Sequence, residues 1–320
     1  METASLNRAD VSGSNSTDRS GARSEPVLGV DIGGTTVKSV VLRSGRVEAR
    51  QRVPRDRPIA DLLAGMVRTS IAEHDVGSVG VGLAGLVDQP TGRYVWGPHL
   101  TDIDVDVASI LGELVESHVV DNDANCAAYA EWLAGPAQGH RVALTVSVGT
   151  GIGAGLVVDG AIWRGSAFAG EVGHMTMSEQ GLDCACGRVG CWETLVSGRR
   201  LEFEASRLGI EGGAEALVAA AQGGSEPAAE SVRVAGMWLG IGITNLILML
   251  DPSIVVVAGG VSLAGAAILD AAREQIASGL PGAGYRPPVA LAQASNGRWA
   301  ASVGAAHLAA ATRAGDPETI

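Results

Sequence analysis

Three of the four cysteines in this 320-residue chain lie within eight residues: Cys184, Cys186 and Cys191. Thiolates at such spacing can bind a metal ion, and a tetrahedral zinc site takes four ligands. The nearest upstream imidazole is His174, whereas the fourth cysteine, Cys126, lies inside a cluster of Asp and Asn residues. The spacing therefore predicts a Cys3His zinc site. Four protein ligands leave no open position, so the metal would be structural.

Two other interpretations of the thiols stay open. Cys184 and Cys191 could form a disulfide, which an intracellular compartment disfavours. Alternatively, the three residues could be buried free thiols.

Two acidic residues, Glu171 and Glu193, flank the predicted ligands and define the cysteine loop, residues 171–193. Carboxylates accept paired hydrogen bonds, as vicinal hydroxyl groups would donate them. His174 could bind zinc through one ring nitrogen and present the other to a ligand. The loop therefore predicts a sugar or polyol pocket.

A glycine turn follows the first apolar run, in the sequence VLGVDIGGTTVK, and we call Asp31–Thr36 the first glycine turn. Glycines let backbone N–H groups approach an anion, and hydroxyl and ammonium groups add donors. An acid at a strand end beside such a turn suits a metal–phosphate ligand. The residues that would serve a phosphate are Asp31, Gly33, Gly34, Thr35, Thr36 and Lys38. An ordinary hairpin turn is the alternative.

The second glycine turn, residues 147–153 (SVGTGIG), has a similar design and offers Gly149, Thr150 and Gly151. It formally matches a dinucleotide-binding pattern, which requires a helix directly afterwards. The residues that follow, GLVVDGAI, predict a strand, so we reject that interpretation. Two such turns on facing lobes would clamp a triphosphate.

A polar cluster, VVDNDANCAAY, lies where a strand is expected to end and a helix to begin; its members are Asp121, Asn122, Asp123 and Asn125. Asp and Asn are preferred helix N-caps, but one cap residue is enough. A carboxylate at this point could orient and deprotonate a hydroxyl nucleophile.

Strand and helix signals alternate around these motifs. Residues 59–74 and 107–118 have helical spacing, and the helix after the polar cluster ends at Gly135, before Pro136. The strand–turn–strand design of residues 27–42 returns at 141–163, which suggests an internal duplication. We therefore expect an α/β protein with two lobes, residues 27–135 and 136–320, the second carrying a zinc-binding loop.

Charge and composition narrow the class of protein. A net charge of −12 argues against nucleic acid as a partner. Residues 1–26 are polar and rich in Ser, which predicts a disordered tail and no secretory signal. Residues 234–250 are apolar but contain Gly and are shorter than the roughly 18 residues of a spanning helix. We expect a buried core helix there, no membrane partner, and a cytoplasmic protein.

Together these motifs resemble the ROK family, which comprises sugar kinases and related repressors of the actin-like ATPase superfamily. The resemblance covers about residues 27–310. DIGGTTVK and VSVGTGIGAGLVVDG resemble its two phosphate motifs, DNDANCAA its catalytic motif, and AGEVGHM with CACGRVGCWE its zinc and substrate motif. The resemblance implies a two-lobed fold of the actin-like, ribonuclease H-like type. It also implies that the protein binds ATP and Mg²⁺.

The resemblance also implies roles for individual residues. Asp123 would be the general base, and Asp31 would act on magnesium through water. The segment VVVAGGVS would line the adenosine site with Gly259 and Gly260. Zinc would be held by His174, Cys184, Cys186 and Cys191. Sugar hydroxyls would contact Asn122, Glu171, His174 and Glu193, in a pocket that also includes Gly85 and His99.

Three departures from the family's pattern concern the acceptor. Ala84 stands where glucokinase-like members usually have Pro, and His99 where they usually have Asn. GSAFAGE is one residue shorter than the usual loop. Glucose is the first expected acceptor, but fructose, allose, N-acetylmannosamine and C7-cyclitols are phosphorylated by kinases that resemble this family.

Other classes of function remain as alternatives. A sugar sensor would keep the pocket without phosphotransfer, and a redox or zinc-transfer protein would have labile zinc and bind no nucleotide. The family's repressors carry an N-terminal helix-turn-helix; only 26 polar residues precede the first motif, so we do not expect a repressor. The resemblance also suggests a homodimer.

Overall fold

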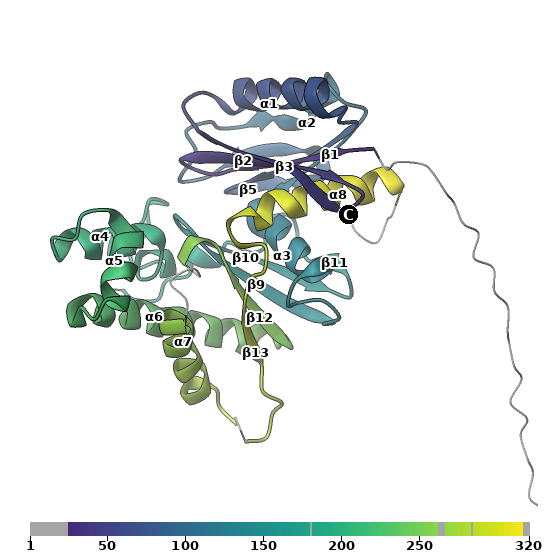
Figure 1. Cartoon of the computed structure of the whole chain (residues 1–320). Helices are drawn as coiled ribbons and strands as arrows, with labels where there is room; N and C mark the ends of the chain where they lie inside the picture. Colours follow the sequence, from purple (N-terminus) through teal and green to yellow (C-terminus); the bar gives the residue numbers. More distant parts are fainter. Residues whose placement is uncertain (1–24, 180, 262–265, 283, 316–320) are drawn as a thin grey trace, which may run out of the picture.

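The computed structural model describes residues 25–179, 181–261, 266–282 and 284–315. The predicted tail, residues 1–26, therefore lies outside the described residues except for its last two. The described chain forms two five-stranded β-sheets with helices above, between and below them, and a smaller third sheet (Figure 1).

The first sheet has the strand order β3-β2-β1-β4-β8. Its strands are β1 (Val27–Ile32), β2 (Thr36–Arg43), β3 (Arg46–Pro54), β4 (Ser78–Leu83) and β8 (Ser117–Asn122). The first three form an antiparallel meander, and β4 and β8 run parallel to β1. Parallel strands end at the same edge, so the residues after β1 and β8 meet there.

The second sheet repeats this design with the order β11-β10-β9-β12-β13. Its strands are β9 (Val142–Val148), β10 (Ile152–Val158), β11 (Ala161–Ile162), β12 (Ile254–Ala258) and β13 (Ala290–Gln293). Again three strands form an antiparallel meander and two run parallel to the first. The shared order confirms the internal duplication predicted from the two glycine turns.

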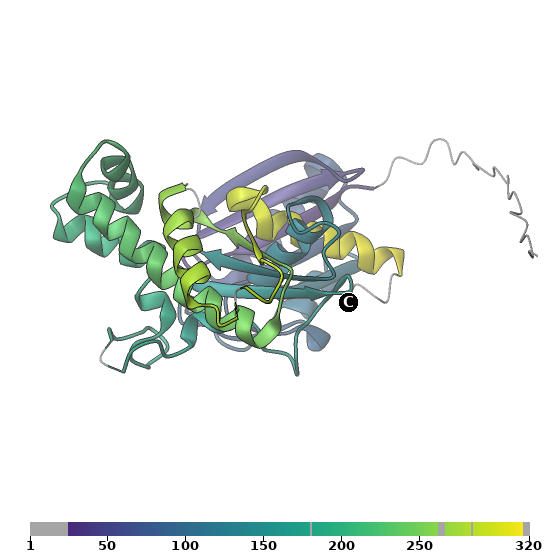
Figure 2. The same cartoon turned by 90° about the horizontal axis from the view of Figure 1, so that it is seen from below.

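Helices cover both sheets. In the first half of the chain they are α1 (Ile59–His74), α2 (Val107–Gly112) and α3 (Asp123–Ala134). In the second half they are α4 (Gly198–Arg207), α5 (Gly213–Gln222), α6 (Glu226–Leu250), α7 (Ala266–Gly279) and α8 (Ala300–Ala314). Figure 1 shows α1 and α2 above the first sheet, α3 and α8 between the sheets, and α6 and α7 below the second. Figure 2 shows α4 and α5 projecting to one side.

Two expectations about the elements were wrong. The helix expected over 107–118 ends at Gly112. The last two residues of the expected range, from Ser117, instead pair in the first sheet as the start of β8. A third, three-stranded sheet was not foreseen; it consists of β5 (Leu86–Asp88), β6 (Arg93–Trp96) and β7 (Val105–Asp106). Short strands interrupted by turns carry too little periodicity to predict.

Helix α6 was expected as a buried core helix over 234–250. Of the helices the structure describes, it is the one long and apolar enough to cross a membrane by length and composition, but 56% of its most apolar window is buried. It begins earlier than expected, at Glu226, and one of its faces reaches solvent.

Backbone contacts fix the layer between the sheets. Helix α8 comes from the end of the chain but packs on β1, β4 and β8 of the first sheet, while α3 packs on β9 and β10 of the second. A Cβ added at Gly80 would lie 1.8 Å from the carbonyl oxygen of Ala305, and one at Gly304 1.7 Å from that of Cys126. These sites accept only glycine, because any side chain would separate the layers. The lobe boundaries drawn at residue 135 stay a proposal.

We predict that Gly80→Ala destabilises the fold by about 2 kcal/mol or more, because the methyl group meets helix backbone that cannot rotate away. Chemical denaturation would measure the free energy of unfolding. The matched control is Gly65→Ala in α1, where an added Cβ meets no described atom within 4 Å; it should be neutral or stabilise by up to about 1 kcal/mol. Equal stability of the two variants would contradict this account of the layer.

Candidate active site

The first glycine turn connects β1 to β2 and is closed by a hydrogen bond from Gly33 N to Thr36 O, 3.0 Å. Asp31 is buried at the end of β1, and its Oδ2 lies 2.5 Å from Lys38 Nζ on the neighbouring strand. Arg55 supports the turn from behind, since its Nε donates to Gly34 O at 3.0 Å. The turn is therefore held by hydrogen bonds on both sides, and its Asp31 forms an ion pair with Lys38.

Three adjacent parallel strands place Asp31 and Asp121 at the same height in the first sheet. Asp31 on β1 is in register with Gly82 on β4, which is in register with Asp121 on β8. Asp123 follows at the start of α3, and a Cβ added at Gly82 would lie 3.3 Å from its Cα. Glycine at this position leaves room for α3 to begin beside the first glycine turn.

The residues of the polar cluster after β8 have different hydrogen-bond partners and different roles. Asn122 caps α3, since its Oδ1 accepts from Ala124 N at 2.8 Å and Asn125 N at 3.2 Å. Its Nδ2 donates to Gly85 O at 3.0 Å, which ties the cap to the predicted substrate segment. The capping interpretation thus holds for Asn122 and leaves the neighbouring carboxylates to be explained.

Asp121 is buried and fully engaged. Its Oδ2 accepts from Arg164 Nε at 2.9 Å and Nη2 at 2.7 Å, and its Oδ1 accepts from Asn125 Nδ2 and Asn122 N. This ion pair connects the end of β8 to the loop that leads to Glu171. Sequence reasoning missed Arg164, because a pair separated by 43 residues has no local pattern.

Asp123 is the carboxylate of this cluster that has no cationic partner within hydrogen-bond distance among the described residues; its Oδ1 accepts only from Ala124 N, at 2.9 Å. Burial raises the pKa of Asp123 to about 7, and the negative charges of Asp31 and Glu171 add to the effect. A carboxylate with a pKa near neutrality can accept a proton from a hydroxyl group while remaining ionised much of the time.

His99 lies between the two glycine turns. A Cβ added at Gly34 would lie 2.9 Å from the Cβ of His99, and one at Gly151 would lie 3.1 Å from its Nε2. Its Nε2 is buried, makes no hydrogen bond within the described structure, and lies 3.8 Å from Glu193 Oε2. The first turn, the second turn and Glu193 of the cysteine loop therefore all lie close to His99.

The cysteine loop brings its four predicted zinc ligands together, with all ligand atoms within 4.8 Å of one another. Cys186 Sγ lies 3.7 Å from Cys191 Sγ, and Cys184 Sγ lies 3.6 Å from His174 Nδ1. Tetrahedral zinc with the usual bond lengths requires about 3.8 Å between sulfurs and about 3.6 Å between sulfur and nitrogen. The donor set and its spacing fit Zn²⁺, and none of the four cysteines forms a disulfide.

The same loop carries the two acids on short 3₁₀ turns. Glu171 precedes the turn Val172–His174, and Glu193 lies within the turn Trp192–Thr194, directly after Cys191. His174 Nδ1 faces the thiols, while its Nε2 lies 3.8 Å from Glu171 Oε2. Burial, and then the charge of Glu193, raise the pKa of Glu171. A metal ion here would fix both turns and so place both carboxylates.

The second glycine turn links β9 to β10. Its Gly149 lies beside the first residue of helix α4, since Gly198 N donates to Gly149 O at 2.7 Å. Gly259, after β12, approaches the end of β9: a Cβ there would lie 2.4 Å from Val148 O. Among the described residues, no atom lies within 4 Å of a Cβ added at Gly260. The helix N-terminus at Gly198, which favours anions, was not predicted from the sequence.

Comparison with known proteins agrees with this arrangement. The family model described as "ROK family" matches residues 27–312. The chain is 34% identical over 312 residues to a glucokinase of Streptomyces coelicolor, covering 88% of this chain and 96% of that protein. It is 29% identical over 225 residues to a xylose repressor of Bacillus subtilis, covering 68% of this chain and 58% of the repressor.

Among solved structures, a ROK family glucokinase from Streptomyces griseus in complex with glucose and AMPPNP superposes with a TM-score of 0.83 at 33% identity. The match covers 89% of this chain and 99% of that one. The actin-like ATPase fold expected from the sequence is thereby confirmed.

We predict that Cys186→Ser lowers the zinc content from one ion per chain and reduces thermal stability, because one of four ligands is lost. Metal analysis by mass spectrometry and a melting curve would measure both. Cys126→Ala is the control, since Cys126 is buried in α3 and outside the four-ligand cluster; it should keep its zinc. Unchanged zinc in Cys186→Ser would contradict the proposed ligand set.

Proposed function

The chain belongs to the ROK family, and from this we propose that it is an ATP-dependent sugar kinase that transfers the γ-phosphoryl group of ATP to a hydroxyl group of a hexose, with glucose as the first candidate. The observation that carries the proposal is Asp123, a carboxylate that no described cation meets at hydrogen-bond distance, near Asp31 of the first glycine turn and Glu171 of the cysteine loop.

In the proposed mechanism the two glycine turns hold the phosphates of ATP. Backbone N–H groups of Gly33, Gly34, Gly149 and Gly151, with hydroxyls of Thr35, Thr36 and Thr150, supply donors on both sides. Lys38 adds positive charge, and the N-terminus of α4 favours the anion. Gly259 and Gly260 are assigned to the adenosine side.

The acceptor is assigned to the side of Asp123. Asn122, Glu171, His174 and Glu193 would bind the sugar hydroxyls, with Gly85 and His99 completing the pocket. Asp123 takes the proton of the reacting hydroxyl as that oxygen attacks the γ-phosphorus in line. Positioning and charge stabilisation supply most of the rate enhancement in such a transfer.

Two metal ions belong to the proposal. Zn²⁺ would have a structural role, held by His174 and the three clustered cysteines, without contact to the reacting atoms. Mg²⁺ neutralises phosphate charge when bound with ATP, and Asp31 would orient it through water. We further propose that residues 27–135 and 136–320 close as lobes over the substrates and that the enzyme works in the cytoplasm.

We predict that Asp123→Asn lowers kcat by at least about 100-fold while sugar binding, measured by calorimetry, is retained. In the unsubstituted enzyme, kcat/KM should rise with pH around about 7, since the raised pKa of Asp123 delays formation of the active carboxylate. The rise should be absent from the residual activity of Asp123→Asn. A variant with nearly full turnover would show that another group is the base.

A second candidate acceptor class follows from His99. An imidazole occupies the position between the two glycine turns, so a kinase of another hexose, of N-acetylmannosamine or of a valiolone-type cyclitol is the alternative. Coupled ADP release with ATP–Mg across glucose, mannose, fructose, allose, N-acetylmannosamine, N-acetylglucosamine and such a cyclitol separates these cases. If ATP binds but no acceptor of the panel gives ADP release, a sugar sensor would be favoured.

We predict that His99→Asn changes the ratio of kcat/KM between two acceptors of this panel by about tenfold, the effect of one altered hydrogen bond in a buried pocket. His74→Asn serves as the control, because His74 lies at the end of α1, beside Glu48 on β3. Identical acceptor ratios for the His99 and His74 variants would show that His99 does not select the sugar.

A further inference from the structure

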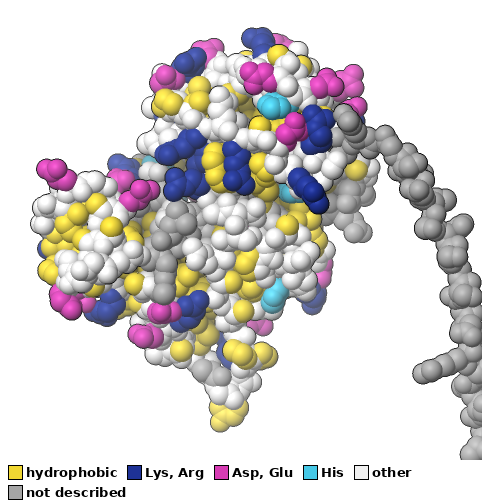
Figure 3. Space-filling model, in the orientation of Figure 1, with side chains coloured by type: hydrophobic (Ala, Val, Ile, Leu, Met, Phe, Trp, Pro, Cys, Tyr) yellow, Lys and Arg dark blue, Asp and Glu magenta, His cyan; other side chains and the backbone are white. Residues whose placement is uncertain are grey.

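Arg55 is the least exposed of a group of arginines around β3. Six residues of the stretch 43–57 are arginine, and Figure 3 shows Lys and Arg side chains gathered across the middle of this face, where Figure 1 places β3. The side chain of Arg57 is 58% exposed, whereas that of Arg55 is 12% exposed. Charged side chains are rarely buried unless they are paired. The contacts of Arg55 therefore indicate its role.

Arg55 is bound to the first glycine turn by its backbone and by its side chain. Its backbone N donates to Thr35 O at 3.0 Å, and its Nε donates to Gly34 O at 3.0 Å. Each peptide unit is planar, so a held carbonyl also fixes the direction of the N–H group of the next residue. Arg55 thereby orients two N–H groups of the turn, those of Thr35 and Thr36.

Another nitrogen of the same guanidinium faces Asp102. Arg55 Nη1 lies 3.6 Å from Asp102 Oδ2, and both side chains are mostly buried. Asp102 Oδ1 accepts from Ile59 N at 3.1 Å, so this carboxylate also holds the start of α1. We call residues 94–102 the His99 segment, because it begins in β6, carries His99 between the two glycine turns and ends at Asp102. Arg55 thus connects this segment to the first glycine turn.

The His99 segment also touches the turn directly. A Cβ added at Gly34 would lie 3.0 Å from His99 O, so the two backbones are in contact. Three buried polar atoms of the segment have no hydrogen-bond partner within the described chain: Tyr94 Oη, His99 Nε2 and Asp102 Oδ2. Buried polar atoms cost free energy when they are unpaired. A shift of the segment that pairs them is therefore favoured.

A hollow beside the ion pair gives it room to move. Its volume is about 370 Å³, and it is lined by Arg55, Asp56, Arg57, Pro58, Thr101 and Asp102. Both partners of the ion pair belong to this wall. They can approach each other more closely without displacing the packed core of the first sheet, where a shift would be resisted on all sides.

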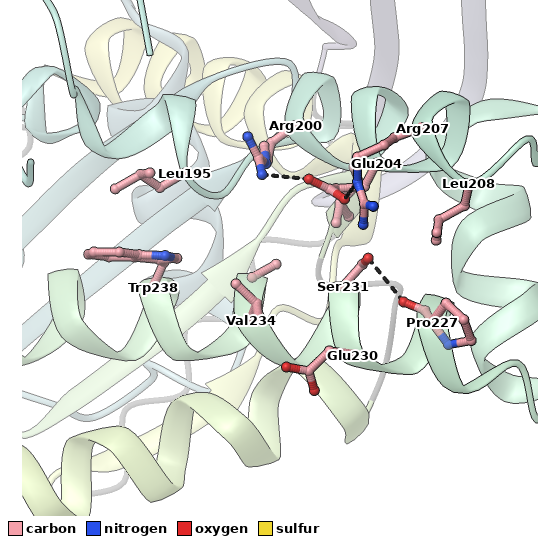
Figure 4. A pocket seen from close by; sticks show the side chains of 12 residues that line it. Leu195, Arg200, Glu204, Arg207, Leu208, Pro227, Glu230, Ser231, Val234 and Trp238 are labelled. Carbon is pink, nitrogen blue, oxygen red and sulfur yellow. Dashed lines mark hydrogen bonds and ion pairs between the residues drawn. The ribbon is translucent and has the colours of Figure 1, made fainter. Parts of the chain in front are cut away.

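The ion pairs of another hollow, between α4 and α6, have a different character (Figure 4). There Glu204 lies 2.5 Å from Arg200 and 2.7 Å from Arg207. These three side chains come from one helix, at spacings of four and three residues, so their pairing stabilises α4 itself. Arg55 and Asp102 instead join segments that lie far apart in the sequence, as a connection between two sites requires.

We propose that Arg55 is a positioning residue that couples the two candidate substrate sites through Asp102. The coupling rests on the proposed function, which assigns the first glycine turn to the nucleotide phosphates and His99 to the acceptor pocket. Phosphate that draws the N–H groups of the turn toward itself also moves the guanidinium, and with it Asp102 and the His99 segment. Binding at either site then strengthens binding at the other, since such coupling is reciprocal.

Calorimetry of AMPPNP–Mg binding, with and without saturating glucose or the panel acceptor that binds best, tests the coupling without turnover. In the unsubstituted chain the acceptor should lower the Kd of AMPPNP at least about fivefold. Arg55→Lys keeps the charge but loses the fork that reaches both partners. Its ratio should fall below about twofold, while each ligand still binds. Arg57→Lys is the matched control and should keep the full ratio, because Arg57 is exposed and pairs with its neighbour Asp56.

Asp102→Asn tests the other partner. Its amide oxygen can still accept from Ile59 N, so α1 keeps its start, but the charge that faces Arg55 is lost. The acceptor effect on the Kd should fall as in Arg55→Lys, and the double variant should fall no further, since both substitutions remove one connection. A full ratio in Arg55→Lys, additive losses in the double variant, or an unsubstituted chain without the effect would overturn the proposal.

Hydrogen exchange gives a second readout, which needs no acceptor. AMPPNP–Mg should slow amide exchange in peptides that cover residues 94–102, both in the unsubstituted chain and in Arg57→Lys, and this slowing should be at least halved in Arg55→Lys. Equal slowing in all three chains would contradict a connection through Arg55. Coupling without ADP release would contradict the proposed kinase and support this connection, whereas normal turnover with an unchanged ratio in Arg55→Lys would do the reverse.

Discussion

Helices α3 and α8 are in backbone contact between the two sheets, and the rest of the structure depends on this contact. Gly304 allows α8 to touch the carbonyl of Cys126 on α3, and Gly80 allows α8 to touch β4. Because α3 begins with Asp123, the contact that sets the distance between the sheets also sets the position of the candidate base. Gly29 meets the same requirement for thin layers, since a Cβ there would lie 1.9 Å from the carbonyl oxygen of Ser302.

On this scaffold, neighbouring carboxylates acquire different properties from their surroundings. Asp121 is paired with Arg164 and serves the structure, whereas Asp123 is partly buried beside further acids, which raise its pKa. In the cysteine loop, one cluster of four donor atoms draws on residues in or next to two turns that each carry an acid. Charge is thereby concentrated where a polyhydroxylated, phosphate-accepting substrate would lie.

Short sequence patterns predicted the turns, the side-chain clusters and the helices that depend on residues close together in the chain. The two glycine turns revealed the duplication, the spacing predicted that His174 and the three clustered cysteines lie together, and α1 matches its predicted range. Long-range contacts had no such signal: α8 returns to the first sheet, and Arg164 pairs across 43 residues. For α6, hydrophobicity indicated a buried helix, but only the structure separates its core face from the face that reaches solvent. The roles assigned to Asp123 and the sugar-binding residues stay predictions.

The most direct test of the central claim follows phosphorus during the reaction. Phosphorus-31 NMR spectra of the enzyme with ATP–Mg and glucose, or the best acceptor of the panel, would show where the γ-phosphoryl group goes. The account predicts a new phosphomonoester resonance that grows in step with ADP, only when the sugar is present. Unchanged ATP signals with every acceptor, or release of inorganic phosphate at the same rate without sugar, would contradict it.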